Sequence, residues 1–256
     1  MGECVLTSRH GEITTEILTP ASNLSIGETV SINIDGEPYE FIVVHQGLPS
    51  SGYDASCNGT WLLMKDIYTL HHFTYETYNE EYDWYDGDPW EYSKYTKIAE
   101  CLNDIYNKID PTIKQSIVTA NVPSQYYYDR INGSDYDPYY FSSSVTAMPV
   151  FLLSTAELGL GDTQSDGSKY YYYYQEGDTL DYFTFGNDST AKSRRIAFYN
   201  SRATQWWTRT NGGGERSCAY INEGGSGSSA EGNYSLGVRP AIIVPFDTKF
   251  AISLLD

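Results

Sequence analysis

Basic residues are scarce in this sequence, and long apolar runs are missing. The 256 residues include 16 Lys and Arg against 34 Asp and Glu, which gives a formal net charge of -18. Nucleic-acid binding needs a concentrated basic surface, so we expect no nucleic-acid partner. No apolar run approaches the ~20 residues that cross a bilayer. Residues 1–19 also lack the basic start and apolar centre of a signal peptide. We therefore expect neither membrane insertion nor a signal peptide.

Cysteine and histidine are also few, with four of each, and neither is spaced as in a metal site. His71 and His72 are adjacent, and on a strand they would face opposite sides. The HExxH, GxSxG, Walker A and GxGxxG motifs are absent. We predict no metal ion, no cofactor and no catalytic residues. The cysteines, which we expect to be free thiols in a reducing compartment, are Cys4, Cys57, Cys101 and Cys218.

Tyrosine is the residue in excess, with 25 copies. Its side chain combines a large contact area, few rotatable bonds and a polar tip, which suits recognition surfaces. Many tyrosines gather in residues 126–140, an irregular stretch, and in residues 170–174, which are five tyrosines in a row. We expect these rings to lie on the surface or in subunit interfaces.

Residues 76–91 are acidic and aromatic, and two functional interpretations stay open beside that of a solvated loop. Asp83, Asp86 and Asp88 suggest a calcium site, although the regular spacing and closing Glu of an EF-hand are missing. Two carboxylates of this stretch could instead serve glycoside hydrolysis. Charge runs are usually solvated, so we predict a loop without metal.

The apolar pattern predicts an α+β protein. Residues 30–34 and 39–43 alternate around Asp35-Gly36, which indicates a β-hairpin. Residues 92–109 have helical spacing and end at Asp110-Pro111, a pair that also starts a short helix over 112–117. A buried strand is predicted at 149–153, followed by a short helix that a capping box at Ser154 and Glu157 opens. We expect a flexible N-terminal arm over 1–25 and one domain over 26–256.

The stretch from Trp206 to Pro245 has two apolar ends around a polar centre. Trp206 and Trp207 are adjacent on a predicted strand, so one should face the core and the other the opposite side. Either both are packing aromatics, or the outward one, which we take to be Trp207, forms the floor of a binding site. The other end, 238–244, is predicted as one buried strand. A buried Arg needs a carboxylate or several carbonyl partners, so Arg209 and Arg239 are predicted to be structural. The centre is too polar to pack by itself, as in a binding loop held by a scaffold.

These residues carry a family resemblance. The motif WWTRT at 206–210, a polar loop, and GVRPA at 237–241 resemble the uncharacterised "WWLRS…GVRPA" proteins of phages and prophages in gut Firmicutes. Pieces at 26–30, 41–45, 58–65 and 151–154 agree in order. The resemblance implies a C-type lectin-like fold with short twisted sheets, two helices and long irregular loops. It also implies kinship with the variable proteins of diversity-generating retroelements, whose surfaces are diversified at Asn codons.

The implied function is non-enzymatic recognition of a host-surface protein or glycan, in a protein that is virion-associated or in the bacterial cytoplasm before assembly. The variable region would be about 206–240. Glu215, Glu223 and Glu231 cannot arise there from Asn codons changed only at adenines, so they are fixed, or diversification has another origin. The expected ligand-binding residues are Trp207, Asn211, Gly213, Arg216, Ser217, Tyr220, Asn222, Ser226, Ser228, Asn233 and Tyr234.

Two alternatives stay open. The protein could be a structural virion or tail-assembly component, a homo-oligomer with Tyr-rich subunit interfaces, or a glycoside hydrolase that uses residues 76–91. The sugar-binding motifs EPN, QPD and WND of animal lectins are absent, so lectin activity does not follow from the implied fold. The oxidising cysteine pair of formylglycine-generating enzymes, which share that fold, is also absent.

Overall fold

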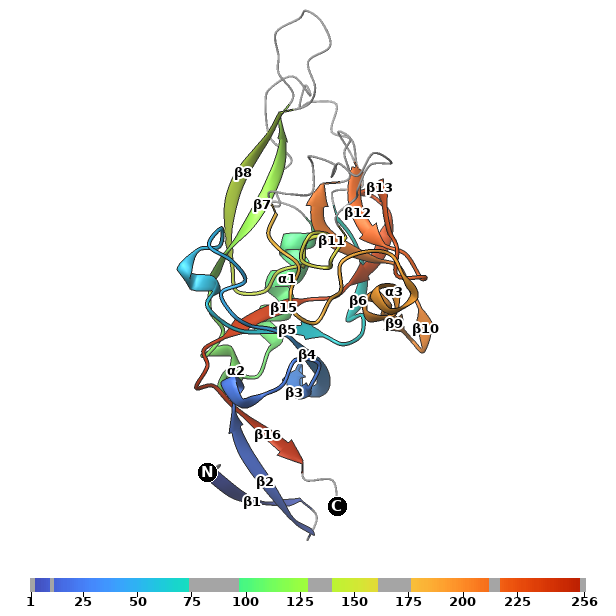
Figure 1. Cartoon of the computed structure of the whole chain (residues 1–256). Coiled ribbons are helices and arrows are strands. Elements are labelled where there is room, and N and C mark those ends of the chain that lie inside the picture. The colour runs from blue at the N-terminus through green and yellow to red at the C-terminus, as the bar shows by residue number, and fades with distance from the viewer. Residues whose placement is uncertain are drawn as a thin grey trace, which may run out of the picture.

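The computed structural model is a β-rich α+β protein with three α-helices and several open sheets in its described part (Figure 1). The described residues are 3–9, 12–73, 97–128, 140–160, 176–211 and 217–253. The predictions for 76–91, 170–174 and most of 126–140 lie outside them. In the part that is described, no helix is both long enough and apolar enough to span a membrane.

A four-stranded sheet in the order β15-β5-β4-β3 carries much of the core. The predicted hairpin is confirmed, because β3 and β4 pair across a turn in which Asp35 and Gly36 have φ of 56° and 82°. Positive φ at both positions is the conformation that an Asp-Gly hairpin turn favours. All residues of β5 and β15 are buried. The strands are β3 (Thr29–Ile34), β4 (Glu37–Gly47), β5 (Gly59–Met64) and β15 (Ala241–Val244).

A five-stranded sheet in the order β13-β12-β11-β14-β6 lies beside it and contains the 206–245 stretch as far as Val238. Strand β11 pairs antiparallel with β12 and parallel with β14, where Trp206 lies opposite Gly237. Strand β13 pairs with β12 and forms one edge of the sheet. The strands are β6 (Thr69–His72), β11 (Trp206–Asn211), β12 (Ser217–Ile221), β13 (Gly227–Glu231) and β14 (Ser235–Val238).

The single strand predicted over 238–244 is wrong. The chain leaves the five-stranded sheet after Val238 and joins the four-stranded sheet at Ala241, so β14 and β15 belong to different sheets. Pro240 lies between them, and it has no backbone N–H with which to continue a ladder. Residues 239 and 240 therefore connect the two sheets.

The helices agree with the sequence in part. Helix α1 (Lys97–Lys108) and helix α2 (Pro111–Lys114) lie in the predicted places, and the Asp110 side chain accepts the N–H of Thr112 as an N-cap. A third helix, α3 (Ser189–Arg195), was not predicted, so the expectation of two helices is corrected. Its N-cap is Asp188, whose carboxylate accepts the N–H of Ala191.

The predicted capping box forms, but no helix follows it. Ser154 N–H donates to Glu157 at 2.9 Å, and Glu157 N–H donates back to Ser154 Oγ at 3.1 Å. Gly159 has φ of 73° and lies against the Thr184 carbonyl, where a Cβ would come within 2.6 Å. The chain therefore turns instead of continuing as a helix. The preceding 149–153 stretch is also not a strand, since only Phe151 forms a bridge, to Ala241.

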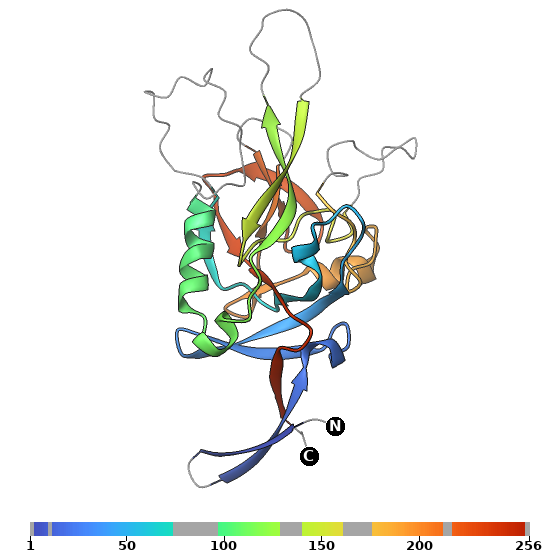
Figure 2. The same ribbon diagram turned by 90° about the vertical axis from the view of Figure 1, so that its left-hand side faces the viewer.

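The predicted N-terminal arm forms strands, which corrects the expectation for residues 1–25. Strands β1 (Glu3–Arg9), β2 (Glu12–Pro20) and β16 (Lys249–Ser253) make a sheet in the order β1-β2-β16. Figures 1 and 2 show it projecting from the body, with both chain ends nearby. Its partner strand lies at the other end of the sequence, so local periodicity could not reveal it.

Two short hairpins complete the fold. Strands β7 (Ala120–Tyr128) and β8 (Tyr140–Met148) form a ribbon, seen at the top of Figure 1. Strands β9 (Phe198–Tyr199) and β10 (Arg202–Ala203) form a hairpin just before β11. The turn of this second hairpin keeps Asn200 and Ser201 at φ of 49° and 63°, the left-handed region that costs on the order of 1 kcal/mol per non-glycine residue.

Candidate functional site

Arg209 ties the five-stranded sheet to the turn that begins at Ser154. Its Nη1 and Nη2 donate to the Glu157 carboxylate at 2.5 Å and 2.6 Å, and both side chains are fully buried. Further hydrogen bonds go to the carbonyl oxygens of Leu152, Pro123 and Glu176. Burial by itself would lower the pKa of Arg209, but the charge of Glu157 outweighs it and raises that pKa. The guanidinium is thus a fixed interior cation that solvent does not reach.

Arg239 lies in the link between the two sheets, and no carboxylate of the described residues bonds to it. Its Nε donates to the Met64 carbonyl at 2.8 Å and its Nη2 donates to the Lys65 carbonyl at 2.9 Å. The guanidinium lies 4.9 Å from the centre of the Trp206 ring, a cation–π distance. Burial lowers the pKa of Arg239 to about 10. The structure places this side chain in the interior, where it holds β14 against the end of β5.

Arg195, at the end of α3, holds the turn between β12 and β13. Its Nε donates to the Gly225 carbonyl at 2.8 Å, its Nη1 to the Leu158 carbonyl, and its Nη2 to the Gly186 carbonyl. Its own carbonyl accepts Trp206 Nε1 at 3.0 Å. Burial lowers the pKa of Arg195. Sequence reasoning missed this residue, because its partners are backbone carbonyls that no side-chain motif marks.

The expectation that Trp207 faces outward is wrong. Trp206 and Trp207 are both 0% exposed. Trp207 packs edge-on against Phe73 and Tyr220, and its Nε1 donates to the His71 carbonyl. Strand β11 is interior to its sheet and covered on both faces, so adjacent residues on it face two packed layers instead of core and solvent. Trp207 is therefore not in position to contact a ligand.

The other expected binding residues have different fates. Tyr220 is partly buried against Trp207, and Asn222 is committed to its own turn, where its Oδ1 accepts the N–H groups of Gly224 and Ser226. Ser228, Asn233 and Tyr234 are exposed, Tyr234 by 57%. Ser226 is half-buried. Only the backbones of Asn211 and Ser217 are described, as strand, and Gly213 and Arg216 lie outside the described residues.

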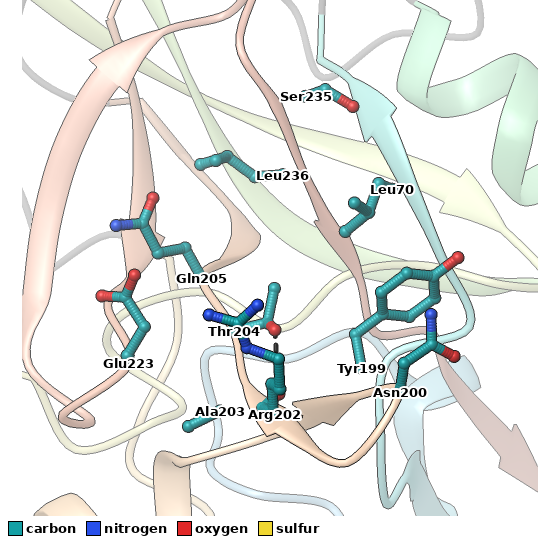
Figure 3. Close-up of a pocket in the computed structure, with 10 residues that line it drawn as sticks. All are labelled: Leu70, Tyr199, Asn200, Arg202, Ala203, Thr204, Gln205, Glu223, Ser235 and Leu236. Carbon is teal, nitrogen blue, oxygen red and sulfur yellow. Dashed lines mark hydrogen bonds between the residues drawn. The ribbon is translucent and has the colours of Figure 1, made fainter.

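A hollow of about 390 Å³ opens beside this surface (Figure 3). It lies between the β9–β10 hairpin, the start of β11, the β12–β13 turn and strands β14 and β6. Figure 3 shows Gln205 and Glu223 on one side and Tyr199 and Asn200 on the other, with Arg202 between them. The remaining lining residues are Leu70, Ala203, Thr204, Ser235 and Leu236. The volume is at the lower end of the ~300–1,000 Å³ of ligand pockets.

The sequence model of a domain of unknown function, DUF6273, matches residues 58–246. The chain belongs to this family. The matched range contains every residue that lines the hollow, together with β5, β11 and β15. Strands β1 to β4 and β16 lie outside it. Searches of curated proteins and of solved structures gave no match.

The DUF6273 chain presents mainly hydrogen-bonding side chains in the hollow. Within the described part, no ion pair joins Arg202 to Glu223, and no group of three or more His, Cys, Asp or Glu side chains is placed to hold a metal. Sequence reasoning missed this site. The strands within residues 199–205 are too short to show alternation, and Glu223 differs from the expected binding residues because it cannot arise from an Asn codon changed only at adenines.

Proposed function

We propose that this protein is a non-enzymatic recognition protein that binds a host-surface protein or glycan, as a receptor-binding component of a phage or prophage with a C-type lectin-like fold. The observation that carries the binding role is the hollow, whose wall offers Arg202, Gln205 and Glu223 to a ligand. The phage origin, the fold family and diversification of the 206–240 region rest on the WWTRT and GVRPA motifs.

The scaffold around the hollow supports a binding role. Arg195 fixes the turn that carries Glu223, through its bond to the Gly225 carbonyl. Thr204 N–H donates to the Ala197 carbonyl, and the Gln205 carbonyl accepts Gly237 N–H. A backbone fixed in this way loses little freedom when a ligand binds, which favours affinity.

The β9–β10 turn shapes one side of the hollow. Asn200 and Ser201 are its two central residues, and both have positive φ, which is the ordinary geometry of a two-residue hairpin turn. The turn brings Asn200 and Arg202 to the wall of the hollow.

The exposed surface next to the hollow extends the candidate site. Strand β13 carries Ser228 and Ser229 in exposed positions, and Asn233 and Tyr234 follow it. Small polar residues around an exposed Tyr are typical of recognition surfaces that bind through adaptable polar contacts. The ligand would therefore contact the hollow and this rim together.

The test is binding of the fluorescently labelled protein to a panel of Gram-positive bacterial cells. We expect it to bind some strains, and the double variant Tyr199→Ala/Gln205→Ala to lose that binding. Asp104→Ala, which removes an exposed carboxylate on α1, is the control. Equal thermal stability of the variants would show that folding is intact.

Two results would overturn the proposal. Equal cell binding by wild type and the double variant would remove the hollow as the binding site. Release of reducing sugars from the cell walls during the assay would favour the hydrolase alternative instead, and that outcome would point to the carboxylates of 76–91.

A further inference from the structure

The charged groups in the hollow balance each other. Arg202 supplies one positive charge and Glu223 one negative charge, and both side chains are exposed. The other lining residues are uncharged. A site for an anion such as a phosphate would concentrate positive charge or backbone N–H groups, which this wall does not do. The hollow therefore suits a neutral ligand that both donates and accepts hydrogen bonds.

Part of the backbone around the hollow is already engaged. Arg202 pairs with Tyr199 in the β9–β10 hairpin, and Ser235 pairs with His72 in the β14–β6 ladder. Thr204 N–H and the Gln205 carbonyl have partners within the protein. These groups are not available to a peptide that adds as a further strand, although β6 is an edge strand of its sheet. The ligand contacts that we assign to the hollow are those of its side chains.

Four of the polar side chains in the hollow are of one kind. Asn200, Arg202, Gln205 and Glu223 each end in a planar group with two or more polar atoms held side by side. Such a group contacts two neighbouring hydroxyls of a ligand at once. Together these four supply both donors and acceptors, which matches a hydroxyl because it donates and accepts.

The hollow also has an apolar part, which suits the C–H groups of a sugar. Its lining includes Leu70, Leu236 and the Tyr199 ring. A sugar ring has C–H groups on its faces and hydroxyls around its edge, so it can contact both parts. We propose that the hollow binds one ring of a neutral sugar, at the end of a glycan and without calcium. This inference rests on the proposed recognition function and names the class of its ligand.

The test combines a printed glycan array with titration of free glucose, galactose, mannose and N-acetylglucosamine. We expect at least one neutral sugar to bind, and binding to persist in EDTA because Glu223 is the only carboxylate among the described lining residues. Glu223→Gln removes a charged acceptor and should weaken binding about ten- to hundredfold. Glu37→Gln changes an exposed Glu on β4, in the four-stranded sheet and outside both the hollow and its rim, and should leave the affinity unchanged.

The outcomes separate the sugar inference from the recognition function. Sugar binding that is lost in EDTA, or that is equal in Glu223→Gln and Glu37→Gln, would overturn the sugar assignment. Cell binding that needs the hollow, survives periodate and is destroyed by protease treatment of the cells would also overturn it and leave recognition standing, with a protein ligand. If the hollow variants change neither cell binding nor sugar binding, both proposals fail.

Discussion

The three buried arginines, Arg195, Arg209 and Arg239, have different kinds of partners for their charged groups. Arg209 has a carboxylate, whereas Arg195 depends on backbone carbonyls and the side chain of Asn187. Arg239 has two carbonyls and the face of Trp206, and its Nη1 has no partner within the described part. A buried charge is costly without partners, so each arginine also fixes the segments that supply them. Of these segments, the turn held by Arg195 is the one that carries a residue of the hollow, Glu223.

Arg209→Met tests the anchor under β11. The change leaves the Glu157 carboxylate buried without its cation, which should lower the free energy of unfolding by about 3–5 kcal/mol. The measurement is urea unfolding followed by tryptophan fluorescence. In the Arg209→Met background, Glu157→Gln should recover part of the loss, because the amide carries no charge into the interior.

Lys65→Met is the control for this experiment. Its Nζ lies 2.6 Å from a Glu40 carboxylate oxygen, but both side chains are about half exposed. Exposed pairs contribute about 0–1 kcal/mol. A loss for Arg209→Met no larger than that for Lys65→Met would show that the buried pair does not support the fold.

At the scale of residues, the sequence indicates which side chains are anchors but not their partners. Arg209 was expected to need a carboxylate, and the capping box already marked Glu157. The two are 52 positions apart, and nothing local links them. Trp207 shows a second limit of prediction from the sequence. The prediction that neighbouring strand residues face core and solvent in turn assumes that one face of the strand meets solvent, and both faces of β11 are covered.

At the scale of elements, the segment after Glu176 is held against the body by a close approach to Tyr53. Tyr53 Oη accepts the N–H of Asp178 at 3.0 Å and donates to Glu157 at 3.0 Å. Gly177 lies between these contacts at φ of 106°, and a Cβ there would be 1.8 Å from Tyr53 Oη. Only glycine has both the backbone freedom and the space for this position.

Gly177→Ala should therefore displace the segment that supplies the Glu176 carbonyl to Arg209. We expect a loss of about 2–4 kcal/mol in the free energy of unfolding, from backbone strain and overpacking together. Thermal and urea unfolding would measure it. Gly36→Ala is the matched control, since Gly36 has φ of 82° with no atom within 4 Å of the added Cβ, and should cost about 1 kcal/mol. Equal losses would mean that the contact with Tyr53 is unimportant.

Some elements with a local signal were predicted well, whereas the strand at 149–153 and the helix after Ser154 were not. The Asp-Gly hairpin and the Asp110 cap depend only on neighbouring residues, so both can be predicted from the local sequence. Strand β16 and the separation of β14 from β15 depend on partners far along the chain. Helix α3 has a good cap in Asp188 but only seven residues, too few for a clear periodic pattern.

At the scale of the whole molecule, the excess of acids and the buried thiols both act against stability at high pH. Burial raises the pKa of Cys57 and Cys101 to about 11, from about 8.5 in an unfolded chain. The folded state then binds more protons than the unfolded state above about pH 8.5. The contribution of these two protonated thiols to the stability of the folded state is complete below about pH 8.5. It is lost as the pH rises toward 11.

We therefore expect Tm to be steady near pH 8 and to fall between about pH 9 and 11, measured by calorimetry. Cys101→Ser should make the fall shallower, because one titrating thiol is removed. High salt screens repulsion between surface acids but not the effect of burial, so part of the fall should persist there. A Tm that is the same at pH 8 and pH 11 would contradict this account.

The sequence by itself determined the α+β fold class, the Asp-Gly hairpin, the first two helices and the structural roles of Arg209 and Arg239. Each of these depends on composition or on neighbouring residues. Only the tertiary structure decided which surface is open. The hollow is formed by Leu70, residues 199–205, the turn at Glu223, and residues 235 and 236, which are far apart in the chain. Their meeting depends on β14 pairing with both β11 and β6, and long-range pairing leaves no trace in local periodicity.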